Sequence, residues 1–73
     1  MPTLGQISNL THYLGQQEWL KVQFGEENEL FEALERASEG QFDYIKLLYT
    51  KGKVSKLRDI LINLGLKPIE PND

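Results

Sequence analysis

Three segments of the chain carry apolar residues at intervals of three or four, and the segments stop at Gly15, Gly40 and Gly65. This period places the apolar side chains on one face of a helix, and glycine commonly ends helices because it tolerates the left-handed conformation found there. The pattern predicts an all-α fold. We expect a small bundle of roughly four to five short helices.

The first predicted helix has a capping signal at its start. Thr3, followed three positions later by Gln6, matches the capping box, in which each side chain bonds the backbone amide of the other residue. The helix is expected to end at Gly15. Its apolar stripe consists of Leu4, Ile7, Leu10 and Leu14.

The second predicted helix opens at Gly25, where acids in the first turn favour the positive end of the helix dipole. Gly40 is placed as its C-cap, and Gly65 ends the third predicted helix. The first-turn acids are Glu26, Glu27 and Glu29. The apolar stripes are Leu30, Ala33, Leu34 and Ala37 in the second helix and Val54, Leu57, Ile60, Leu61 and Leu64 in the third.

Residues 18–24 and 41–49 are rich in aromatic and β-branched residues, which suit a strand as well as a buried helix. If 41–49 were a strand, the helix between 18–24 and 41–49 would form a crossover, and its two connecting loops would be the single residues Gly25 and Gly40. The usual connections are about two to six residues long. We therefore prefer helix for both segments, with an α+β fold containing strands near 18–24 and 41–49 as the alternative.

A chain of 73 residues has room for one domain. We place this domain at residues 1–66 and expect residues 67–73, which contain prolines, to form a flexible C-terminal tail. No cysteine is present to form a disulfide or a thiolate metal site. No apolar run approaches the roughly 20 residues of a membrane span. These features predict a cytoplasmic protein that does not insert into membranes.

Groups for catalysis are scarce. His12 is the only histidine, and no cysteine exists to complete a metal shell or a nucleophilic pair with it. Glu32, Glu35 and Glu39 are predicted to lie on one helical ridge opposite the apolar stripe, and we name them the acidic ridge. A pair of carboxylates acting as acid and base needs one carboxyl group in an apolar pocket, whereas this ridge faces water. We expect neither enzymatic activity nor a cofactor.

Charge is divided unevenly along the chain. Residues 1–45 carry eight acids and two bases, a net charge of −6, whereas residues 46–67 carry six bases and one acid, a net charge of +5. Such asymmetry concerns association rather than fold. It predicts an acidic face and a basic face, which either dock onto partners or neutralise each other within one molecule.

The basic residues within 46–58 raise the alternative of a small nucleic-acid-associated regulator whose cationic side chains contact phosphates. A helix–turn–helix arrangement does not fit at either nearby glycine. Only eight residues follow Gly65, two of them prolines, and a turn at Gly52 would direct Arg58 inward. The net negative charge of the chain also disfavours binding to a duplex.

Residues 29–64 follow a rhythm of Leu-Phe-x-x-Leu, a short turn, Ile-x-x-Leu, a basic turn and Leu-x-x-x-Leu. The matching positions are Leu30, Phe31, Leu34, Phe42, Ile45, Leu48, Leu57 and Leu61. This rhythm resembles the middle helices of death-fold adaptor domains, namely death-effector domains and the effector-associated domains of bacterial proteins. The resemblance implies a compact helical bundle that associates with like domains through charged faces. Death-effector domains carry an Arg-x-Asp-Leu motif, whereas Arg58 and Asp59 are adjacent here, so no functional residue is carried over.

Together these observations predict a non-catalytic protein-interaction or regulatory module. Its partner is another protein or a second copy of the chain, which would make it a homo-oligomer. Ile62 lies almost opposite the apolar stripe of the third predicted helix, so it is either a lone surface side chain or an apolar contact for a partner. The predicted partner-binding residues are Ile62, the acidic ridge Glu32, Glu35 and Glu39, and a basic patch of Lys51, Lys53, Lys56 and Arg58.

Overall fold

The computed structural model describes residues 2–70, and this range contains five α-helices and no strand. The all-α prediction is confirmed. Both ambiguous segments are helical, so the α+β alternative is wrong. The helices are α1 (Leu4–Gly15), α2 (Glu18–Phe24), α3 (Leu30–Glu35), α4 (Glu39–Lys51) and α5 (Val54–Asn63).

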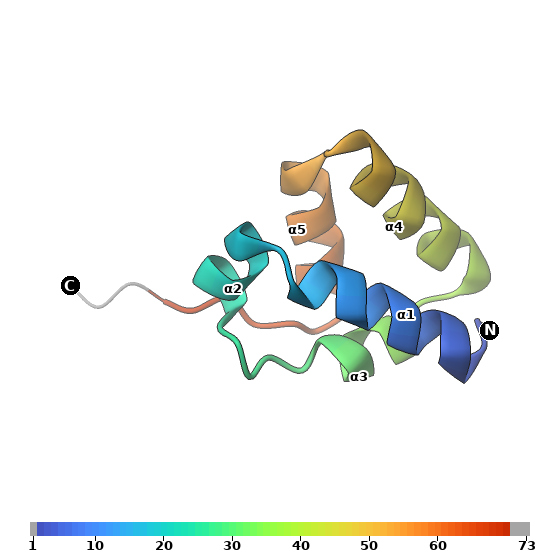
Figure 1. Cartoon of the computed structure of the whole chain (residues 1–73), viewed down its shortest axis with the longest axis horizontal. Helices are drawn as coiled ribbons and strands as arrows, with labels where there is room; N and C mark the ends of the chain where they lie inside the picture. The colour runs from blue at the N-terminus through green and yellow to red at the C-terminus, as the bar shows by residue number, and fades with distance from the viewer. Residues whose placement is uncertain (1, 71–73) are drawn as a thin grey trace.

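The helices pack mainly in two pairs, α1 with α3 and α4 with α5. A tight turn through Gly52 and Lys53 joins the second pair. Gly52 has a φ of +68°, a left-handed conformation that glycine adopts without strain, and this lets the chain turn sharply. In Figure 1, α4 lies along one edge of the molecule, while α2 lies at the other end beside the C-terminal segment.

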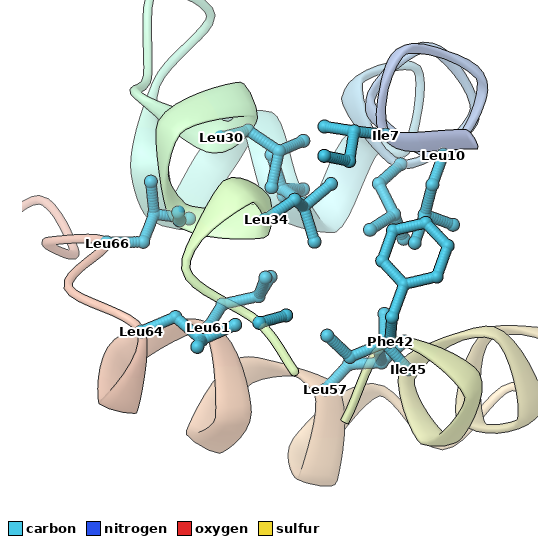
Figure 2. Close-up of a cluster of buried hydrophobic side chains, with 14 of the residues drawn as sticks. Ile7, Leu10, Leu30, Leu34, Phe42, Ile45, Leu57, Leu61, Leu64 and Leu66 are labelled. Atoms are coloured by element: carbon cyan, nitrogen blue, oxygen red, sulfur yellow. The ribbon is translucent and has the colours of Figure 1, made fainter. Parts of the chain in front are cut away.

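The core between the helices is apolar. Figure 2 shows Ile7 of α1, Leu34 of α3 and Leu57 of α5 pointing into one cluster of side chains. No polar or charged residue is buried among residues 2–70. Helices this short are marginal in isolation, so their stability depends on this cluster. The predicted stripes supply most of it, namely Ile7, Leu10, Leu14, Leu30, Ala33, Leu34, Ala37, Leu57, Leu61 and Leu64.

The acidic segment before α3 is not helical, so the predicted start at Gly25 is wrong. Gly25 has a φ of +83°, and Asn28 closes a turn beside it. The Nδ2 of Asn28 donates to the Gly25 carbonyl oxygen at 2.6 Å, and its Oδ1 accepts from the Leu30 amide at 3.1 Å. Asparagine side chains compete in this way with helical hydrogen bonds. The helix therefore begins only at Leu30.

The prediction of Gly40 as a C-cap is also wrong, because α3 ends at Glu35 and Gly40 is the second residue of α4. Ser38 is the N-cap of α4. Its Oγ accepts from the Gln41 amide at 3.3 Å, and the Oε1 of Gln41 accepts from the Ser38 amide at 3.1 Å. This is the same capping box that was predicted for the start of α1, where the structure confirms it.

Replacing Ser38 with alanine is expected to lower the free energy of unfolding by about 1 kcal/mol, because the amide of Gln41 loses its partner and the box is broken. Ser8 provides the matched control. It is exposed in the interior of α1, where Ser8→Ala should leave the free energy of unfolding unchanged or slightly raised. Urea unfolding followed by circular dichroism measures both. Equal losses in the two variants would contradict the capping role of Ser38.

A side chain distant in sequence holds the end of α5. The Nη1 of Arg36, which follows α3, donates to the carbonyl oxygen of Leu64 at 2.7 Å. Gly65 comes next with a φ of +102° and ends the helix as predicted. Since the donor is charged, this hydrogen bond is stronger than a neutral one, and it ties the end of α3 to the end of α5.

The residues after α5 run back to α2. Leu66 is buried in the core, and the Ile69 amide donates to the Gln23 carbonyl oxygen at 2.7 Å. The structure thus places the first part of the predicted tail 67–73 against the domain. Residues 71–73 of that tail lie outside the described residues.

Candidate functional site

The basic patch surrounds the turn between α4 and α5. Lys51 is the last residue of α4, Lys53 lies in the turn, and Lys56 lies in the first turn of α5. These three lysines are exposed. Arg58 is half-exposed, and its Nη1 lies 3.8 Å from the Oδ1 of Asp59. A surface ion pair this long and this exposed contributes little, so the patch remains strongly cationic.

The acidic ridge does not form on a single helix, and this part of the prediction is wrong. Glu32 and Glu35 lie on α3, whereas Glu39 is the first residue of α4. The capping box at Ser38 separates them, because it begins a new helix where a continuous one was expected. Three further acids lie in the loop before α3, namely Glu26, Glu27 and Glu29, and all are exposed.

The acids of α3 and the basic patch lie on different sides of the molecule. In Figure 1, α3 and the loop before it are at the lower edge, while the turn between α4 and α5 is at the upper edge. Within residues 2–70 no salt bridge joins Glu32 or Glu35 to any residue of the basic patch. The acids of α3 and the basic patch therefore do not neutralise each other by direct contact.

Ile62 is less accessible than its position in the sequence indicated. It is half-buried and packs against the core cluster. A partly covered isoleucine offers a partner only a small apolar area. We therefore assign its packing first to the stability of the domain.

Sequence reasoning missed an apolar face on α4. Tyr44 and Leu47 are exposed there, whereas Phe42, Ile45 and Leu48 of the same helix are buried. The three-residue spacing of Tyr44 and Leu47 places them side by side on the helix surface. The signal was present in the sequence, because Leu47 falls outside the stripe that faces the core.

The groove between α1 and α4 contains two open hollows, with volumes of about 170 and 200 Å³. Both are lined in part by Gln6 and Phe42, so they adjoin each other. Asp43 lines one hollow and Lys46 the other. The walls mix amide, aromatic and charged groups, and Glu39 lines the first hollow together with Asp43.

His12 is exposed, and its Nε2 lies 3.2 Å from the Nε2 of Gln16. No group of three His, Cys, Asp or Glu side chains within residues 2–70 is arranged to hold a metal ion. In the same part of the chain, none of the helices has both the length and the apolar character that crossing a bilayer requires.

Comparison of the chain with family models, with curated proteins and with solved structures finds no significant match. The candidate site is therefore defined by the charges and the exposed apolar groups of this chain alone.

Proposed function

We propose that the chain is a non-catalytic protein-interaction or regulatory module that docks through its basic patch and through the acids of α3. The observation that carries this proposal is the separation of the two charged groups on the fold, without a salt bridge between them. Solvated charges of opposite sign that do not contact each other within one copy can each attract a complementary surface on a partner. Such complementarity raises the encounter rate and selects the partner.

Two further observations support the proposal. The sequence rhythm that resembles death-fold adaptor domains implies association with like domains through charged faces. The chain also carries both surfaces that such docking needs, since the basic patch of one copy is opposite in charge to Glu32 and Glu35 of another. A second copy is accordingly the first partner to test.

Reversing Lys53, Lys56 and Arg58 to glutamate is expected to weaken docking roughly tenfold or more while leaving the helical circular dichroism signal intact, because all three lie on the surface. A second variant with Glu32 and Glu35 changed to lysine should bind the first and restore docking. Isothermal titration calorimetry at low and high salt measures the binding. Lys67→Glu, an exposed reversal outside the patch, is the control and should dock like the wild type.

The rescue distinguishes docking from phosphate binding. If the basic patch binds nucleic acid, changing its cationic residues to glutamate also abolishes binding. In that case, adding the variant whose acids are changed to lysine does not restore binding. Duplex DNA would then bind the wild-type chain with an affinity that falls steeply as salt rises. Absence of docking in the wild type, or failure of the rescue in a folded mixture, would count against the proposed function with a second copy as partner.

A further inference from the structure

The outward face of α4 carries two apolar side chains that the core does not use. Tyr44 is 43% exposed and Leu47 is 48% exposed. In Figure 1, α4 forms an edge of the molecule, and no other helix lies outside it. A Cβ atom built on Gly40, one turn before Tyr44, meets no atom within 4 Å, so this side of the helix is open to an approaching surface.

Two opposite charges flank Leu47 at equal distances along the same helix. Asp43 precedes it by four residues, and Lys51 follows it by four residues. Residues four apart are neighbours on a helix surface, so the three side chains form one ridge about 12 Å long. Asp43 and Lys51 are both exposed, and neither forms a salt bridge within residues 2–70.

This ridge is complementary to itself when it is reversed. If a second α4 lies antiparallel with the two copies of Leu47 in contact, Asp43 of each copy comes beside Lys51 of the other. Ridges of residues four apart are the rows that interdigitate in the commonest class of helix packing. The same patch on both copies then forms a closed two-fold interface.

We propose that two copies of the chain pair through the outward faces of α4 in this antiparallel arrangement. Leu47 and Tyr44 supply the buried apolar contact, and the two Asp43–Lys51 pairs set the direction. The pairing goes beyond the proposed function and does not rest on it, because its contacts lie along α4, and Lys51 is the residue that it shares with the basic patch. One helix face is small compared with the roughly 1,200–2,000 Å² of stable interfaces, so the dimer dissociates on dilution.

Sedimentation velocity of the whole chain at increasing concentration tests the pairing. In a background with Lys53, Lys56 and Arg58 changed to glutamate, which removes docking through the basic patch, the chain should shift from the mass of a monomer to that of a dimer. Adding Leu47→Glu to this background should leave it a monomer over the same range. Val22→Glu is the matched control, because Val22 is also exposed, at 67%, but lies on α2. Added to the same background, it should leave dimerisation unchanged. Circular dichroism establishes that both variants remain folded.

The charges give a sharper test of the geometry. Asp43→Lys alone and Lys51→Glu alone should each raise the dissociation constant roughly tenfold, because both contacts of the homodimer then repel. An equimolar mixture of these two single variants should form a heterodimer in which both contacts attract. The double variant should dimerise with itself for the same reason. A double variant no better than the single ones would overturn the antiparallel arrangement.

A variant with Lys53, Lys56 and Arg58 changed to glutamate that stays monomeric at every concentration would overturn the pairing itself. The two proposals fail separately. Leu47→Glu leaves the basic patch and the acids of α3 unchanged, so the calorimetric docking and its rescue persist in that background. Reversal of Lys53, Lys56 and Arg58 leaves the ridge of α4 unchanged, so that variant should still dimerise.

Discussion

Replacing Leu61 with alanine is expected to lower the free energy of unfolding by about 2–5 kcal/mol. Leu61 has no exposed surface and lies in the core cluster that α5 presents to the other helices. Truncation removes buried carbon atoms and leaves a cavity that the surrounding helices fill only in part. Leu34→Ala, at an equally buried position of α3, should cost a similar amount.

The loss is large for this molecule, because domains of this size have a total stability of only about 5–15 kcal/mol. Chemical denaturation followed by circular dichroism measures it. Leu4→Ala is the matched control, since Leu4 is also a helical leucine but is 68% exposed. Its free energy of unfolding should change by no more than about 0.5 kcal/mol. Equal effects of Leu61→Ala and Leu4→Ala would contradict the placement of the core.

Gly65→Ala is expected to cost about 2–4 kcal/mol from two causes acting together. The φ of Gly65 is +102°, which a residue with a Cβ atom rarely adopts. That Cβ atom would also lie 2.8 Å from the Nη1 of Arg36. The guanidinium would have to move away from the Leu64 carbonyl oxygen, which would lose its charged donor.

A double-mutant cycle separates the two causes. In an Arg36→Ala background the collision is absent, so Gly65→Ala should cost only the backbone strain, less than in the wild type. Gly15→Ala is the control, because a Cβ atom there meets nothing within 4 Å and its φ is not positive. That substitution should be neutral or stabilising. Strict additivity of the Arg36 and Gly65 substitutions would contradict the coupling between them.

The presence of the helices could be predicted from the sequence, because the spacing of the apolar residues indicates which of them share a buried face. Helix boundaries were harder to predict, for a local reason. Asn28 and Ser38 form side-chain hydrogen bonds just before α3 and at the start of α4, and these bonds determine where the two helices begin. The acids that indicated a helix start at Gly25 do not reveal them. The capping box of Ser38 and Gln41 was readable, since it has the spacing that identified Thr3 and Gln6.

The candidate site was predictable only in outline. The division of charge along the chain indicated an acidic and a basic region, but a single break before Ser38 moved Glu39 onto another helix. Contacts such as that of Arg36 with Leu64 join residues 28 apart in the sequence, and no local pattern indicates them. The exposed position of Leu47, by contrast, could have been predicted, because Leu47 falls outside the buried stripe of Phe42, Ile45 and Leu48.

The single tryptophan has a spectroscopic consequence. Trp19 lies on α2, half-buried against the core, and therefore does not belong to the outward face of α4. Its fluorescence depends on burial, so its emission shifts when the core opens. It is expected to stay unchanged when a second molecule covers the outward face of α4, on which Trp19 does not lie. Fluorescence therefore measures unfolding and sedimentation measures pairing, so both processes can be followed independently in the same unlabelled chain.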